Sequence, residues 1–159
     1  MINIETSGIS EKVISMLESQ GIPVKRKMEI DLPPMPDDIT SVDDQELMML
    51  ANKYMQYYSF MLTQVTCAEL VVLEVENEYD MAEAKAMLSK TTGKTTEKSV
   101  MLKANVLTDP DMQELSRQKL HANAYHKLLK TTLDNLERSY QLTSRELTRR
   151  TSVLKARGF

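Results

Sequence analysis

The sequence predicts an all-α protein in which a short N-terminal helical arm precedes a long antiparallel helical hairpin of coiled-coil type that self-associates. Two long runs of residues at alternating steps of four and three predict the hairpin, because this spacing places them on one helix face. The composition agrees, since the 159 residues include 12 Met but only 4 Gly and no Trp. We therefore divide the chain into an arm with a Pro-rich acidic linker, residues 1–40, and the hairpin, residues 41–159.

The arm is expected to contain one short helix. Ser10 is the predicted N-cap, Ile9 and Ile14 are placed to form a hydrophobic staple over it, and Gly21 with Pro23 ends the helix. Proline removes backbone donors and biases the preceding residue toward extended geometry. We therefore interpret roughly residues 22–40 as a linker.

The first long helix is expected to start near Thr40 and Ser41, followed by Asp43 and Asp44, whose charge complements the helix dipole. Its register continues without a break to about residue 89. The twelve register positions are all apolar: Leu47, Ala51, Tyr54, Tyr58, Met61, Val65, Ala68, Val72, Val75, Tyr79, Ala82 and Ala86. Our candidates for the seam of the core and the oligomer are Tyr54, Tyr58, Met61, Val65, Val72 and Tyr79.

The second long helix is expected to start at Asp109-Pro110, with Asp as the cap and Pro at the first helical position. Its register has four polar members, Lys119, His126, Thr143 and Arg150. The apolar members are Leu115, Ala122, Leu129, Leu133, Leu136, Tyr140, Leu147 and Leu154. Each long helix would have about 45 residues and a length of roughly 70 Å, and the matching lengths predict an antiparallel pair.

A second apolar row on the first long helix predicts self-association. Met48, Met55, Leu62 and Leu73 form this row, with Leu50 and Tyr57 nearby, and one partner helix cannot cover it. Burial of each large side chain contributes roughly 1.5–3 kcal/mol. We therefore expect a homo-oligomer, for which a ring is one possible arrangement.

The strongest functional signal is a lysine-rich segment that joins the two long helices. The chain has a net charge of −3, yet residues 85–103 hold Lys85, Lys90, Lys94, Lys98 and Lys103 against the single acid Glu97. Such lysines can each reach a phosphate without reading base edges, which predicts a sequence-blind, salt-sensitive nucleic-acid site. The alternative is a solvated loop. The acidic stretch from Asp31 to Glu46 is either a tethered competitor for these lysines, a handle for a basic partner, or a solubilising segment.

No pattern predicts catalysis, a metal site or a cofactor. Gly93-Lys94-Thr95 lacks the upstream glycine of a phosphate loop, because Leu88 stands there. His121 and His126 are five residues apart and point to different helix faces. Cys67 is the only cysteine, which fits a reducing compartment. With no signal peptide and no uncharged apolar stretch of 18 residues, we expect an intracellular protein with no membrane span.

From about residue 47 onward the arrangement resembles the UvsY family of phage recombination mediators. The likeness lies in Lys85-Ala86 with Leu88, in Glu97-Lys98-Ser99 followed by Met101 and Lys103, in Val106-Leu107, and in residues 125–129. In that family a Lys-Ala-Arg triplet contacts DNA; Lys85 matches its lysine, but Met87 stands in place of the arginine. Lys90 and Lys94 are candidate substitutes. The arm has no counterpart.

This resemblance implies a non-enzymatic mediator that binds single-stranded DNA, contacts a RecA-type recombinase and a single-strand binding protein, and helps the first replace the second. If the chain is phage-encoded, it would act in the host cytoplasm. The alternative is a coiled-coil scaffold or adaptor of a phage particle that binds only protein.

Overall fold

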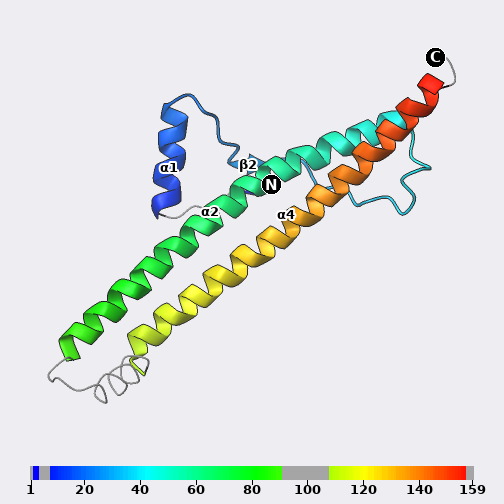
Figure 1. Cartoon of the computed structure of the whole chain (residues 1–159). Helices are drawn as coiled ribbons and strands as arrows, with labels where there is room; N and C mark the ends of the chain where they lie inside the picture. The colour runs from blue at the N-terminus through cyan, green and yellow to red at the C-terminus, as the bar shows by residue number, and fades with distance from the viewer. Residues whose placement is uncertain (1, 4–7, 91–107, 157–159) are drawn as a thin grey trace.

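The computed structural model describes residues 2–3, 8–90 and 108–156, and these residues are mostly helical. Strand β1 (Ile2–Asn3), helix α1 (Gly8–Ser19) and strand β2 (Lys27–Met28) precede the long helices α2 (Asp44–Lys90) and α4 (Pro110–Ala156). Figure 1 shows α2 and α4 side by side along most of their length and running in opposite directions. The predicted all-α class is confirmed.

Both long helices begin with an aspartate cap. Asp43 accepts a hydrogen bond from the backbone N–H of Glu46 at 2.8 Å, so α2 starts three residues later than the predicted Thr40-Ser41. Those two residues instead form a turn around Asp38, whose carboxylate accepts hydrogen bonds from Thr40. At α4 the prediction is correct, because Asp109 accepts from the N–H of Asp111 at 3.1 Å and Pro110 is the first helical residue.

The seam between α2 and α4 follows the apolar register. All twelve register positions of α2 are buried or half-buried, and they include Leu47 at 0% and Tyr54 at 2% exposure. On α4 the last position, Leu154, is 47% exposed. Arg150 pairs with Asp44 at the start of α2, so residues beyond Arg150 have no α2 residue beside them.

The polar register positions of α4 are accommodated individually. Thr143 is fully buried and donates its hydroxyl to the backbone oxygens of Ser139 and Tyr140 at 2.6 and 3.0 Å. Lys119 pairs with Glu76 of α2 at 3.6 Å. His126 is half-buried. A helical pair tolerates such residues where their polar atoms find partners or reach water.

The predicted linker packs against the long helices instead of being a solvated spacer. Residues 28–42, which we call the packed linker, carry no helix, yet Met28 is 1% exposed and shares a core cluster with Leu50, Tyr57 and Phe60 of α2. The hydroxyl of Tyr57 donates to the backbone oxygen of Ile30. The packed linker therefore covers part of the apolar surface that one partner helix leaves exposed.

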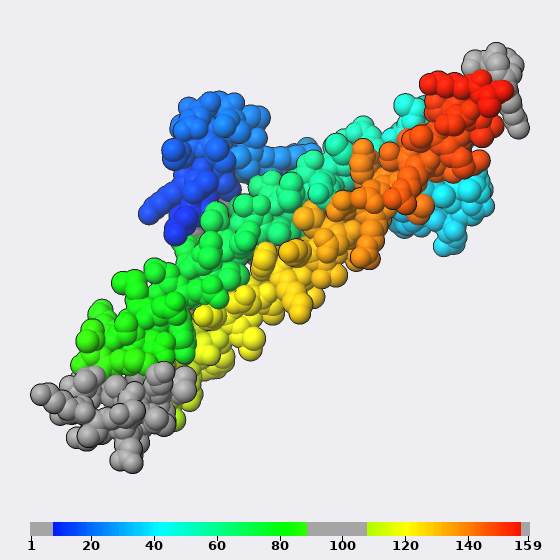
Figure 2. Space-filling view, in the orientation of Figure 1, coloured from blue at the N-terminus to red at the C-terminus, as the bar shows by residue number. Residues whose placement is uncertain are grey.

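The arm is a small unit fastened to the side of α2 (Figure 2). Helix α1 starts at Gly8, so the prediction of Ser10 as N-cap is wrong, and Ile9 is 46% exposed instead of closing a staple. The cap comes from α2, since the carboxylate of Glu74 accepts a hydrogen bond from the N–H of Ile9 at 2.7 Å. A local sequence pattern cannot show a cap that lies 65 residues away.

The C-terminus of α1 matches its prediction. Gly21 adopts φ of 78°, the N–H of Ile22 donates to the oxygen of Leu17 at 3.0 Å, and the N–H of Gly21 donates to that of Glu18 at 3.0 Å. These two bonds form a Schellman motif. Arg26 then pairs with Glu11 and Glu18 at 2.9 Å each, while β1 and β2 pair in antiparallel register, so the arm closes on itself.

Length and composition alone would let α2 cross a membrane. One third of its most apolar 18-residue window is buried inside the structure, and the mostly buried core helix of a soluble protein passes the same length and composition test. This feature is weak evidence for a membrane span.

Candidate nucleic-acid interface

Two of the candidate lysines, Lys85 and Lys90, lie near one end of the rod formed by α2 and α4. Helix α2 ends at Lys90 and α4 begins at Pro110, and Figure 1 shows both at the same end. The side chain of Lys85 is exposed. Lys90 closes the helix, but its side chain is not described, and Lys94, Lys98 and Lys103 lie outside the described residues. The structure thus locates one side chain of the predicted site.

The part of α2 next to Lys85, which we call the stem, is acidic. Glu78 and Asp80 are exposed and Glu83 is half-buried on the same helix. The nearby cation Lys119 is already engaged, because it pairs with Glu76 and its Nζ lies 5.2 Å from the centroid of the Tyr79 ring. At physiological ionic strength charges act over roughly 8 Å, so this stem repels a polyanion. Lys85 is therefore an exposed cation close to exposed acids on the same helix.

The predicted seam residues are covered by other parts of the same chain. Tyr54, Val65 and Val72 are 2%, 8% and 8% exposed. The other three candidates, Tyr58, Met61 and Tyr79, are half-buried. They are covered without a second copy, so any contact between copies would use another face of the rod.

That other face is the second apolar row of α2. Its members remain exposed: Met48 at 62%, Met55 at 46%, Leu62 at 47% and Leu73 at 56%. The two neighbours named with it, Leu50 and Tyr57, are covered, at 8% and 6%. The packed linker and α4 contribute to the cluster that covers them. The row itself is therefore an exposed apolar surface on α2.

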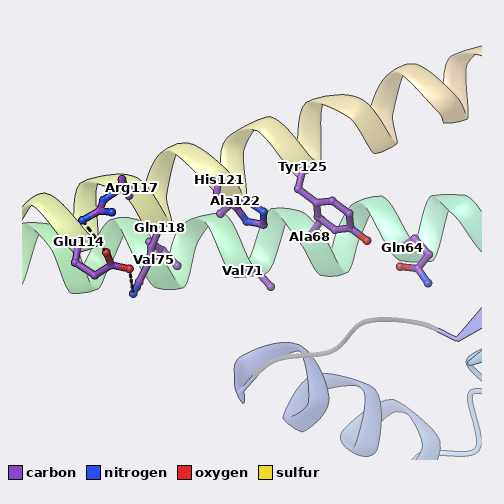
Figure 3. Close-up of a pocket in the computed structure, with 10 residues that line it drawn as sticks. All are labelled: Gln64, Ala68, Val71, Val75, Glu114, Arg117, Gln118, His121, Ala122 and Tyr125. Atoms are coloured by element: carbon purple, nitrogen blue, oxygen red, sulfur yellow. Dashed lines mark hydrogen bonds and ion pairs between the residues drawn. The ribbon is translucent and has the colours of Figure 1, made fainter.

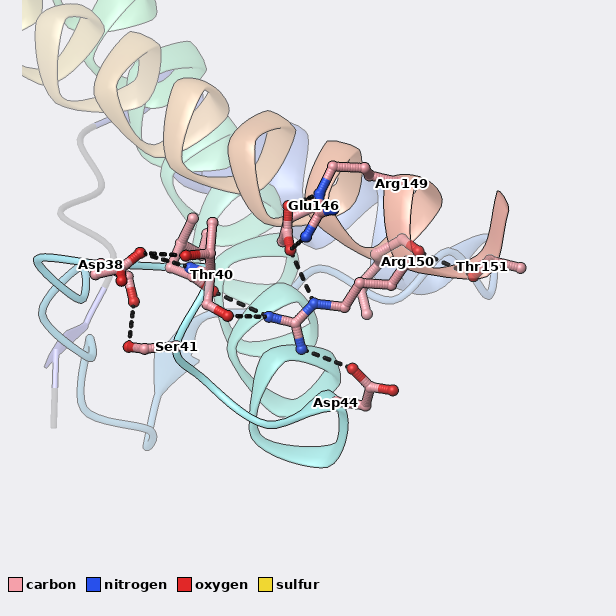
Figure 4. A network of polar contacts seen from close by, with 10 residues as sticks. Asp38, Thr40, Ser41, Asp44, Glu146, Arg149, Arg150 and Thr151 are labelled. Carbon is pink, nitrogen blue, oxygen red and sulfur yellow. Dashed lines mark hydrogen bonds and ion pairs between the residues drawn. The ribbon is translucent and has the colours of Figure 1, made fainter. Parts of the chain in front are cut away.

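The opposite end of the rod carries a polar clasp that sequence reasoning missed (Figure 4). Arg150 donates to Asp44 at 2.6 Å, to Glu146 at 2.8 Å, and to the backbone oxygens of Ile39 and Thr40 at 3.3 and 3.0 Å. It thereby joins the end of α4 to the start of α2 and to the packed linker. The sequence did contain one signal of the clasp, because Arg150 occupies a position in a register whose members are mostly apolar.

Glu146 is the acid at the centre of the clasp. Arg149 reaches it with two hydrogen bonds of 2.7 Å, and Arg150 adds a third. Hydrogen bonds from Arg149 and then Arg150 lower the pKa of Glu146 to about 2. In the adjoining turn, hydrogen bonds from Thr40 lower the pKa of Asp38. Glu146 therefore stays ionised at neutral pH.

The acidic stretch from Asp31 to Glu46 lies at the clasp end. Along α2, the distance from Asp44 to Lys85 is about 60 Å, from 41 residues at about 1.5 Å per residue. Within one chain this stretch cannot compete for Lys85. The structure shows a role that the sequence did not suggest, because Asp38 holds the turn at Thr40 and Asp44 binds Arg150 of α4.

No family model, curated protein or solved structure matches the chain. The evidence for function therefore comes from the residues themselves and from the resemblance stated above. Among the described residues no three His, Cys, Asp or Glu side chains are grouped to hold a metal ion. Burial raises the pKa of the Cys67 thiol, which keeps that thiol in its less reactive protonated form.

Proposed function

We propose that this chain is a non-enzymatic recombination mediator that binds single-stranded DNA through Lys85, Lys90, Lys94, Lys98 and Lys103. One observation carries the proposal: five lysines face a single acid over residues 85–103 in a chain whose net charge is −3. The exposure of Lys85 next to an acidic stem supports it, because that contrast in charge directs a polyanion to the tip.

The chemistry of the segment favours backbone contacts over base recognition. Lysine is a point charge on a flexible stem, and phosphate contacts fix position without carrying sequence information. No aromatic residue lies between Lys85 and Lys103, so bases have no local stacking partner. Binding should therefore be independent of sequence and should weaken steeply with salt.

Self-association is part of the proposed mechanism. The exposed row Met48, Met55, Leu62 and Leu73 would be buried between copies, with each side chain contributing roughly 1.5–3 kcal/mol. A homo-oligomer, for example a ring of coiled-coil hairpins, would then present several lysine segments to one strand. Weak contacts from each copy would add through effective concentration.

The protein partners follow from the resemblance to the UvsY family. They are a RecA-type recombinase and a single-strand binding protein, and the mediator would help the first replace the second on DNA. The proposal places this activity inside the cell, in the host cytoplasm if the chain is phage-encoded. It requires no cofactor.

The decisive experiment measures binding to fluorescent single-stranded DNA at rising salt. The logarithm of the binding constant should fall with a slope of about −0.7 per neutralised phosphate. Substituting Lys90, Lys94 and Lys98 together by Ala should reduce that slope. The matched control removes three lysines from α4, at 127, 130 and 155, and so changes the net charge equally. An equal loss in both variants would refute a dedicated site.

The alternative function is a coiled-coil scaffold or adaptor of a phage particle that binds only protein. The exposed apolar row of α2 favours it, since such a surface serves protein contacts whether or not DNA is bound. The same titration separates the two functions. Absence of salt-dependent DNA binding by the intact oligomer would favour the scaffold.

A further inference from the structure

The C-terminal part of α4 holds most of the arginines of the chain. Five of the seven arginines lie within residues 138–157, where Glu146 is the only acid. Glu146 is 7% exposed and is already bound by Arg149 and Arg150. Over the described residues 138–156, the exposed surface of α4 is therefore cationic and carries no exposed acid.

Three of these arginines share one face of α4, which we call the arginine stripe: Arg138, Arg145 and Arg149. All three are exposed. Steps of seven and four residues separate them, so they form a row about 16 Å long. The buried Leu136 and Thr143 each lie two residues before a stripe arginine, which places them on the opposite side of the helix. The stripe therefore faces away from the core.

Two arginines of the stripe are free of internal contacts. Four of the six described arginines have an acidic partner in the same chain: Arg26, Arg117 (Figure 3), Arg149 and Arg150 (Figure 4). Within the described ranges, no hydrogen bond or ion pair engages the guanidinium groups of Arg138 and Arg145. Asp134, one turn before Arg138, is exposed and forms no ion pair with it. Both guanidinium groups can thus bind a ligand without breaking a contact of the fold.

The stripe suits a linear polyanion better than a protein partner. A protein interface has an apolar centre, whereas Leu142 is the one large apolar side chain exposed between residues 138 and 149. Arginine presents a planar fork of donors that matches the oxygens of a phosphate, and the same plane stacks on nucleobases. The lysine segment has no aromatic residue for such stacking. The stripe therefore offers a strand contacts that the lysines lack.

The stripe and the lysine segment lie at different places along the rod. Arg150 pairs with Asp44, so Arg138, twelve residues earlier on α4, lies about 18 Å along the rod from the clasp. Lys85 lies about 60 Å from the clasp on the same scale. The two cationic surfaces are therefore about 40 Å apart. A strand of 30 nucleotides, about 100 Å long at 3.4 Å per stacked base, can contact both.

We propose that the arginine stripe is a second contact site for single-stranded DNA, in which Arg138 and Arg145 bind phosphate groups. The inference rests on the proposed function and extends it from the lysine segment to the outward face of α4. The exposed apolar row belongs to α2, so self-association through that row does not use the residues of the stripe.

The test titrates a fluorescein-labelled 30-nucleotide oligothymidylate with the full chain at rising salt, followed by polarisation. Arg138→Gln combined with Arg145→Gln should lower the salt slope by about 1.4, because two phosphate contacts are lost. Binding in 0.1 M salt should weaken about 25-fold, the factor that this slope difference gives between 1 M and 0.1 M. The matched control combines Lys130→Gln with Lys155→Gln. It removes two charges at other positions around α4 and should leave the slope unchanged.

The lysine variant described above, measured in the same titration, separates this inference from the proposed function. If the arginine variant keeps the slope of the unchanged chain while the lysine variant lowers it, the stripe is not a site and the inference is overturned, but the proposed function stands. Equal losses in the arginine variant and its control also overturn the inference. If the unchanged chain does not bind the strand, both proposals fail.

Labelled poly-glutamate tests the stripe as a site for an acidic protein. The arginine variant should bind this polymer as the unchanged chain does. A loss of poly-glutamate binding in the arginine variant, with DNA binding retained, would assign the stripe to an acidic protein segment and overturn the inference.

Discussion

Met28→Ala tests whether the packed linker is part of the cooperative fold. Met28 is 1% exposed and packs with Leu50, Tyr57 and Phe60, so truncation removes a fully buried side chain from the centre of a cluster. Buried Met→Ala changes cost about 2–5 kcal/mol. We expect the lower part of that range, about 2–3 kcal/mol, because the linker has no helical backbone and can partly close the cavity.

The assay is urea unfolding followed by circular dichroism, at one protein concentration because self-association would shift the midpoint. In thermal unfolding the same loss should lower Tm by about 4–12 °C for a chain of this size. Met16→Ala is the matched control, since Met16 is 62% exposed on α1 and its truncation should change stability by less than about 0.5 kcal/mol. Equal effects of the two substitutions would refute the packing of the linker.

Three further predictions concern the apolar row, the clasp and the arm. Leu73→Glu, at a position 56% exposed, should lower the sedimenting mass without loss of helix, because it places a charge in the proposed surface between copies. The carboxyl group of Glu146 should titrate near pH 2 when followed by NMR, because its pKa is lowered from 4.5. Its contribution to the stability of the fold should therefore be complete above about pH 4.5 and be lost as the pH falls toward 2. Glu74→Ala should remove the cap of α1, lower its stability by about 1 kcal/mol, and speed hydrogen exchange of the Ile9 amide.

Each of these predictions has a result that would contradict it. An unchanged mass for Leu73→Glu would exclude the row as an interface. A pKa of Glu146 near its ordinary value would show that Arg149 and Arg150 do not pair with this carboxylate when the protein is in solution. Unaltered exchange at Ile9 would mean that the first turn of α1 is held by something other than Glu74.

Periodicity was sufficient to predict the long helices, because their structure repeats along the chain. The run Leu70-Val71-Val72-Leu73 alone resembles a strand, yet it lies within the uninterrupted register and is helical. The start of α4 could also be predicted, since Asp109 and Pro110 are adjacent in sequence to the turn that they cap. Features determined by neighbouring residues could be predicted from the sequence.

Features that depend on distant partners could not be predicted. Asp43, and not Thr40 or Ser41, caps α2 because Asp38 engages those two residues in a turn of their own. The prolines correctly predicted that the linker is not helical. They could not predict the burial of Met28, because that burial depends on where the linker meets α2. For the candidate site, the sequence marks the charge contrast around Lys85, whereas Lys94, Lys98 and Lys103 have no periodic pattern and lie outside the described residues.

The clasp at Arg150 has a practical consequence for handling the molecule. It anchors the last turns of α4 about 60 Å from Lys85, the distance that α2 spans between Asp44 and that lysine. A dye or a surface tether attached just beyond Ala156 would therefore sit at the far tip of a stiff spacer. Rods immobilised in this way would hold Lys85 toward the solution, which suits single-molecule tests of the proposed DNA binding.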